Sequence, residues 1–320
     1  RQQKTRSVAF NIALIFLAYA IGFAGIGSSP SLSVAVACAV VAQFDPANPI
    51  PLLNIVPSPT ALAQKLTGGL NVPVDDCEKP SQKECLALAP GWPLSTPITL
   101  YFSGDIDPAS IDAGIRLLEV SNGTMTPVPF MASVAPRDPP PEACGIDPAI
   151  VPPGVQVVLS PMAALKNDTQ YMVAVISSPT KGLRDANMKP VDPSALFSLL
   201  NVPSSSAPLV KASDGSVQIA SGLLRSNVSS QVLAGLFPGK SLEDLTDAEK
   251  TQLVTVINGK AADLYTLYSA FFDPVITALV GAGVATRSEL ILVNTWTTGP
   301  APSVGSDPAL GELEFDPANQ

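Results

Sequence analysis

The chain has 320 residues and a net charge of −9, and only 14% of its residues are charged, against about 25% in an average globular domain. This acidic balance excludes a basic nucleic-acid-binding face, which needs clustered lysine and arginine side chains to neutralise phosphates. The sequence contains no histidine, which excludes a Ser-His-Asp triad and a histidine metal site. Paired carboxylates or a Ser-Lys pair would survive this argument, but the commonest catalytic arrangements would not, and we predict no catalytic residue, no metal ligand and no cofactor.

The N-terminal residues predict a single membrane-spanning helix within residues 1–30. Residues 8–27 contain no charged side chain, and about twenty helical residues cover the ~30 Å hydrocarbon core of a bilayer. Basic residues precede this span and do not recur until Lys65, which by the positive-inside rule leaves the N-terminus in the cytoplasm and the body in the periplasm. The predicted anchor contains Val8, Ile12, Ile15, Phe16, Tyr19, Gly22 and Gly25, and its topology follows from Arg1, Lys4 and Arg6.

The alternative for this segment is a cleaved leader. Signal-peptide apolar regions are about 7–15 residues long, which is shorter than this span. Residues 35–38 (AVAC) resemble a lipoprotein processing site, which would leave a mature chain acylated at Cys38.

Residues 31–95 are predicted to be a proline-rich lead-in. The apolar run from Val34 to Phe44 is too short to cross a bilayer and predicts a buried strand. Cys77 and Cys85 close a short polar loop, and in an oxidising periplasm we expect a disulfide between them. A bond from Cys144 to either of them is the alternative.

Residues 96–205 have the pattern of a β-sandwich. Ile98, Leu100 and Phe102 alternate with more polar residues, as in a half-buried strand. Residues 115–120, 155–159 and 170–176 predict further strands, separated by turns rich in proline, glycine and aspartate. Several short strands with such turns are typical of an immunoglobulin-like (Ig-like) sandwich.

Three of these segments carry a family resemblance. They are ITLYFSGDIDPASI at 98–111, LKNDTQY at 165–171 and GLRDAN at 182–187. They resemble bacterial Ig-like domains. Together with FDP at 44–46 and GLNVP at 69–73 upstream, they resemble more narrowly the N-terminal region of bacterial virulence-factor lipases. In that family an α/β-hydrolase domain with a G-x-S-x-G motif follows, and this sequence contains no such motif. The resemblance implies the non-catalytic lead-in domain without its enzyme, so no catalytic residue is carried over.

Residues 206–299 predict a helical segment and a returning strand. Thr246 and Glu249 form a capping-box pattern at a helix start, and Asp273-Pro274 predicts the start of a second helix. The apolar stripe expected to face the core is Leu264, Leu267, Tyr268 and Phe271. Residues 289–298 predict the strand, and residues 300–320 form an acidic, proline-rich tail.

Two further groups of residues suggest alternative sites. Asp105, Asp107 and Asp112 lie close together in the sequence and could bind Ca²⁺ through oxygen ligands, although their spacing is not that of an EF-hand. Ser178 and Lys181 have the spacing of a Ser-Lys catalytic pair, but the surrounding sequence predicts a turn and not a helix start.

The sequence thus predicts a mainly β chain, an Ig-like β-sandwich with a small helical C-terminal part, preceded by one transmembrane helix. We expect a non-catalytic structural or accessory subunit in a bacterial inner membrane, which docks on a respiratory, photosynthetic or transport complex. Its expected partners are other subunits of that complex and the lipid bilayer, and no nucleic acid. The alternatives are a cell-envelope adhesion-type lipoprotein and a lipase-related enzyme with an unrecognised site.

Overall fold

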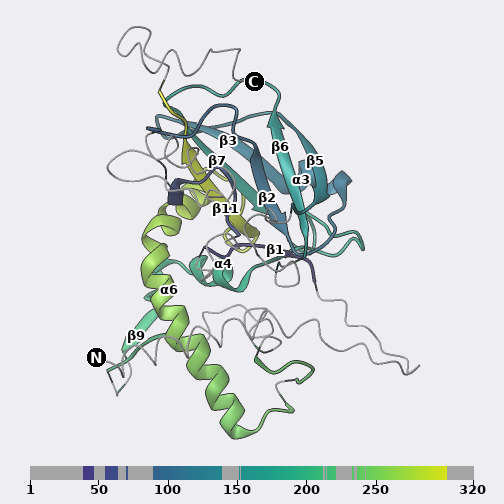
Figure 1. Ribbon diagram of the computed structural model, residues 1–320. Helices are drawn as coiled ribbons and strands as arrows, with labels where there is room; N and C mark the ends of the chain where they lie inside the picture. The colour runs from purple at the N-terminus through teal and green to yellow at the C-terminus, as the bar shows by residue number, and fades with distance from the viewer. Residues whose placement is uncertain are drawn as a thin grey trace, which may run out of the picture.

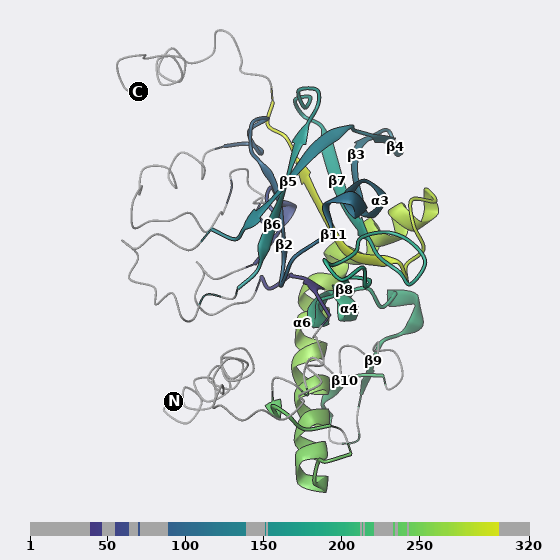
Figure 2. The same ribbon diagram turned by 90° about the vertical axis from the view of Figure 1, so that its right-hand side faces the viewer.

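The computed structural model describes residues 39–46, 55–63, 70, 89–138, 151, 153–211, 213, 215–220, 233, 236–241 and 243–300. Within these ranges the chain is mainly β, as predicted, with two main sheets, a small third sheet and several helices. Buried side chains of both main sheets belong to one hydrophobic core. Figure 2 shows the strands of the two sheets on either side of this core and a long helix running away from them.

The first main sheet has five strands in the order β5-β6-β2-β1-β8 (Figure 1). Its central strand β2 has Ile98, Leu100 and Phe102 almost completely buried, as their alternation predicted. Thr99 on the other face of β2 is also buried, and it pairs with Ser58 of the lead-in segment. The strands are β1 (Val41–Ala42), β2 (Ile98–Phe102), β5 (Phe130–Pro136), β6 (Val155–Pro161) and β8 (Asp192–Pro193).

The second main sheet has four strands in the order β11-β7-β3-β4. Its strands β7 and β11 are buried on both faces, so that neither shows a hydrophobic alternation. Strands β3 and β4 form a hairpin whose two-residue turn, Asn122-Gly123, has positive φ at both positions, as a type I′ turn requires. The strands are β3 (Ile115–Ser121), β4 (Thr124–Pro127), β7 (Gln170–Ile176) and β11 (Leu290–Thr297).

The remaining elements connect and cover these sheets. A hairpin of β9 (Leu209–Lys211) and β10 (Val217–Ile219) lies beside the long helix α6. The helices are η3 (Ala61–Ala63), η4 (Pro108–Ser110), α3 (Ile111–Gly114), α4 (Ala195–Leu200), η7 (Ser204–Ser206) and α6 (Asp247–Gly281).

Helix α6 corrects two predictions about the C-terminal part. It is one helix that continues through Pro274, and no second helix starts at Asp273. A proline inside a helix costs about 3 kcal/mol, and burial of Phe272 and Ile276 on either side of it offsets this cost. The predicted apolar stripe is also wrong in part, because Leu267 is 66% exposed. The predicted capping box at the start of α6 is confirmed.

Among the described residues, one helical stretch is long and apolar enough to span a bilayer, and it is Ala261–Gly281 of α6. Phe272, Ile276 and Leu279 in this stretch are part of the main hydrophobic core. A core helix of a folded domain satisfies the same length and composition test, so we assign this stretch to the folded body.

Candidate functional site

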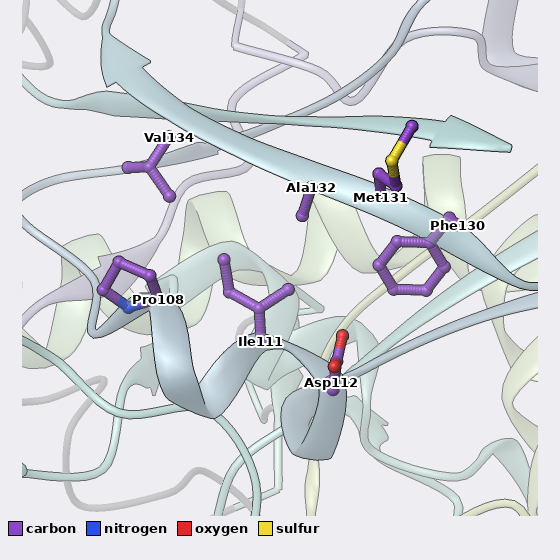
Figure 3. A pocket seen from close by; sticks show the side chains of 7 residues that line it. All are labelled: Pro108, Ile111, Asp112, Phe130, Met131, Ala132 and Val134. Carbon is purple, nitrogen blue, oxygen red and sulfur yellow. The ribbon is translucent and has the colours of Figure 1, made fainter. Parts of the chain in front are cut away.

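A trough of about 590 Å³ lies on the described surface, between strand β5 and the segment η4-α3. Figure 3 shows Phe130, Ala132 and Val134 of β5 along one side of it and Ile111 below Ala132. Pro108 and Asp112 lie toward opposite ends of this trough. The trough is open to solvent and therefore cannot enclose a small molecule as a deep binding pocket would.

The segment η4-α3 is fixed in place by hydrogen bonds to the turn at 182–187. The carboxylate of Asp107 caps η4 by accepting a bond from the main-chain N–H two residues later, at 3.1 Å. The Ser110 hydroxyl donates to the Asp107 carbonyl at 2.8 Å and accepts from the Arg184 N–H at 2.9 Å. A Cβ atom on Gly114 would lie 2.4 Å from the Leu183 nitrogen, so only glycine allows α3 to approach this turn. The floor of the trough is therefore rigid.

Strand β5 forms the other wall and is the edge strand of its sheet. Its residues from Phe130 to Pro136 carry no charge, and none of them is fully buried. Met131, on the outer face, is 64% exposed. Edge strands in soluble proteins commonly carry charged residues that prevent pairing with another chain, and this one does not.

The trough has one charged group, which is the carboxylate of exposed Asp112. Arg116 lies nearby, but its guanidinium donates to the main-chain carbonyls of Asp112 and Ile115. The trough therefore combines apolar walls with a single negative charge at the Phe130 end.

A polar cluster lies on the outer face of the same sheet. The Arg137 guanidinium lies 5.3 Å from the centre of the Tyr101 ring, and the Gln156 amide donates to the Asp138 carboxylate at 2.9 Å. Burial raises the pKa of the Tyr101 phenol above 10.0, and the Arg137 charge opposes this rise. The cluster therefore holds a protonated phenol and contributes no nucleophile at neutral pH.

A second, shallower hollow of about 540 Å³ lies between β10 and α6. Val217 and Leu267 form its apolar part, and Asp263 is its only charged side chain. Its strand β10 is only three residues long, and its lining contains no converging set of polar groups, so the trough beside β5 is the better candidate site.

Ser178 and Lys181, which have the spacing of a Ser-Lys pair, do not have a catalytic geometry. The Ser178 hydroxyl donates to the Lys181 carbonyl at 3.3 Å and accepts from the Lys181 N–H at 3.2 Å. The Lys181 ammonium instead forms an ion pair with Glu289 at 2.9 Å. Because the ammonium binds a carboxylate and the hydroxyl binds the main chain, the lysine does not activate the serine.

The aspartates considered for calcium have separate roles in the fold. Asp107 caps η4, Asp112 faces the trough, and the main-chain carbonyl of Asp105 accepts a bond from Ala186. In the described part of the chain, no three side chains of aspartate, glutamate, cysteine or histidine converge as a metal site would require. The calcium alternative has no support from this geometry.

The other sites predicted from the sequence lie outside the described residues. These are the anchor residues from Val8 to Gly25, the basic residues Arg1, Lys4 and Arg6, and the cysteines Cys38, Cys77, Cys85 and Cys144. The trough itself was not predicted, because Phe130 to Pro136 shows no clear alternation and the two walls are distant in sequence. The sequence does contain a signal for the strand next to the trough. Asn122-Gly123 is a typical hairpin turn and predicts β4 directly before β5.

Comparison with known protein families matches the middle of the chain. Residues 71–228 match the family described as bacterial virulence factor lipase N-terminal. No curated protein and no solved structure matches the chain. The matched residues include strands β2 to β10 and both walls of the trough, whereas α6 and β11 follow the match. The middle of the chain is therefore related to the N-terminal region of the bacterial virulence factor lipases, which confirms the resemblance drawn from its motifs.

Proposed function

We propose that this chain is a non-catalytic accessory module that acts by binding another polypeptide. The observation that carries the proposal is the match to the N-terminal region of a lipase family in a sequence without histidine and without a G-x-S-x-G motif. A module of this kind contributes binding, while hydrolysis needs a nucleophile, a base and an oxyanion hole from another domain or chain.

The site geometry supports this choice. The Ser178 hydroxyl and the Lys181 ammonium, the two groups with the spacing of a catalytic pair, are engaged elsewhere. The trough beside β5 instead offers an uncharged strand edge and apolar walls, which suit contact with a protein chain.

We further propose that the module is attached to the bacterial inner membrane and lies on its periplasmic side. Residues 8–27 would anchor it, and the partner would be a subunit of a membrane complex. The apolar span and the basic residues before it support this placement. Alkaline carbonate extraction and the intact mass test it, because an anchored chain stays in the membrane pellet. A mature chain that starts with acylated Cys38 would contradict the anchor.

The absence of catalysis is tested with the purified chain, a short-chain p-nitrophenyl ester and a fluorophosphonate probe for activated serine. We expect no turnover above that of the heat-unfolded chain and no labelled serine. Turnover in the wild type that Ser178→Ala abolishes would contradict the proposal and would favour the lipase-related enzyme.

The binding role is tested by mild detergent extraction from the source membranes, chemical crosslinking and purification through a C-terminal tag. We expect a defined partner polypeptide at a constant ratio to the chain. Recovery of the chain alone, with and without crosslinker, would contradict the proposal.

A further inference from the structure

We propose that β5 extends its sheet by adding one strand of a partner polypeptide. The partner strand is extended and apolar, and it carries a lysine or arginine that meets Asp112. This inference rests on the proposed function and specifies the chemistry of the partner. It follows from the backbone geometry of β5, the shape of the trough and the charge of the chain.

Among the described residues, one hydrogen-bonding side of the β5 backbone has no partner strand. At the two ends of its ladder with β6, the Met162 N–H donates to the Pro129 carbonyl at 2.9 Å and the Arg137 N–H donates to the Gly154 carbonyl at 3.0 Å. Bonded and non-bonded pairs alternate in an antiparallel ladder, so the odd-numbered residues of β5 bond to β6. The N–H and C=O groups that point away from β6 therefore belong to Phe130, Ala132 and Val134.

In the described part of the chain, β6 is the only strand that pairs with β5. The free groups lie between Pro129 and Pro136, and prolines cannot donate to a ladder. The usable edge is thus about five residues long, which is a common strand length. It contains no lysine or glutamate that would prevent pairing with another strand.

The side chains of the same three residues face the trough. Phe130, Ala132 and Val134 pair with Pro161, Leu159 and Val157 on the inner face of the sheet, yet they are exposed or only half-buried. Ile111, which is 3% exposed, forms the floor below Ala132 (Figure 3). A strand added to β5 would continue the sheet over this floor, and every second side chain of it would enter the trough. Small or β-branched apolar side chains fit such positions.

Charge decides between possible occupants. The trough contains one carboxylate, Asp112, and within the described chain no side-chain group is bonded to that carboxylate. A cationic residue on the partner strand would pair with it, whereas an acidic segment would be repelled. A second copy of this chain would bring a second Asp112 to the same edge. Because the chain carries a net charge of −9, we assign the edge to a different polypeptide.

The test uses a synthetic peptide in which valine and threonine alternate after an N-terminal lysine, with a fluorophore at its other end. Its binding to the purified full chain is followed by fluorescence anisotropy. We expect saturable binding and slower hydrogen exchange of the Phe130, Ala132 and Val134 amides. A matched peptide with glutamate in place of lysine is expected to bind about tenfold more weakly.

Variants of the chain locate the contact. Ala132→Pro removes an outward N–H but no bond to β6, and Ala132→Arg fills the trough without changing the backbone. Each is expected to weaken binding at least about tenfold. Asp112→Asn is expected to weaken binding of the lysine peptide about threefold. The controls are Met125→Pro, which removes an outward N–H from the other edge strand β4, and Asp105→Asn, which removes a nearby charge outside the trough.

Circular dichroism and the urea midpoint establish that each variant folds, and if Ala132→Pro does not fold, Ala132→Arg decides. Absence of peptide binding to the wild type, or equal binding by the Ala132→Arg variant, would overturn the inference. So would a wild-type dimer that Ala132→Arg dissociates, because the edge would then belong to a second copy. Esterase turnover would instead overturn the proposed function, so the two failures are distinguishable.

Discussion

Helix α6 is one continuous element, but its two halves are stabilised by different interactions. In the C-terminal half, Phe272, Ile276 and Leu279 are at most 1% exposed and belong to the main core. In the N-terminal half, Leu253 belongs to a small separate cluster with Leu233 and Leu245. Figure 1 shows the same division, since the upper end of α6 lies against β11 and the lower end extends away from the sheets.

The N-terminal half depends more on local interactions. The Thr246 N–H donates to the Glu249 carboxylate at 2.9 Å, and the Thr246 hydroxyl accepts from the Glu249 N–H at 3.3 Å. Hydrogen bonds from Lys240 and then from Thr246 lower the pKa of Glu249 to about 2, so the carboxylate stays charged at the helix start. Tertiary packing therefore stabilises one end of α6, and its own cap stabilises the other.

The largest effect is expected from Phe272→Ala in the C-terminal half. The Phe272 ring makes edge contacts with Phe44, Phe197 and Phe271, at centroid distances of 5.2, 6.3 and 5.0 Å. Its removal leaves a cavity that these rings cannot fill, and we expect a loss of about 3–5 kcal/mol in the free energy of unfolding. Urea unfolding followed by tryptophan fluorescence measures it. Phe130→Ala in the half-buried strand β5 is the matched control and should lose far less; equal losses would show that the core does not extend onto α6 as described.

The sequence predicts the strands of this core better than it predicts their neighbours. Alternation in Ile98–Phe102 identifies β2, because one face of that strand is apolar throughout. Alternation of apolar and polar residues is absent from β11, where Leu290 to Trp296 are buried on both faces, although the sequence still predicts a strand over 289–298. For α6, apolar residues occur on several faces of the helix. Periodicity therefore selected the stripe with Leu267, whereas packing against α4 and β11 buries Tyr265 and Phe272.

The candidate site was less predictable than the fold. Its walls come from 108–112 and 130–134, and nothing in the sequence states that β5 pairs with β6 on one side only. Pro127, Pro129 and Pro136 interrupt the strand pattern, so β5 was missed. An unpaired edge results from the arrangement of the sheet as a whole, and local sequence patterns carry no information about it.

A smaller effect is expected from Asp273→Asn, which tests the polar contacts of the C-terminal half. The Arg287 guanidinium donates to the Asp273 carboxylate at 2.6 Å, and the Ser204 N–H donates to it at 3.2 Å. Burial favours the neutral form, but the bonds from Ser204 and Arg287 outweigh it and hold the pKa of Asp273 below 3.8. At neutral pH we expect Asp273→Asn to lose about 1.5–3 kcal/mol of unfolding free energy.

The pH dependence of this loss follows from the direction in which the pKa of Asp273 is shifted. Because the pKa of Asp273 is lower in the folded state than in the unfolded state, its carboxylate stabilises the folded state at pH values above 3.8. This stabilisation is lost as the pH falls through the lowered pKa of the folded state. The difference between wild type and Asp273→Asn should therefore shrink on acidification, measured as urea midpoints at several pH values. Glu119→Gln is the control, because its partner Lys166 is 67% exposed and solvent screens the pair. A difference that is constant with pH would contradict the role given to the charge.

The smallest effect is expected from Thr246→Ala, and it separates the two halves of α6 most directly. Loss of an N-cap threonine costs about 0.5–2 kcal/mol, since main-chain N–H groups of the first turn lose an acceptor. Because this end has few core contacts, we expect faster hydrogen exchange in the first turns of α6 and unchanged exchange around Phe272. Thr255→Ala is the control, because Thr255 is exposed in the helix interior, where alanine has the higher helix propensity. If Thr246→Ala accelerated exchange equally at both ends, α6 would unfold as one cooperative unit, and its cap would contribute to the stability of the whole core.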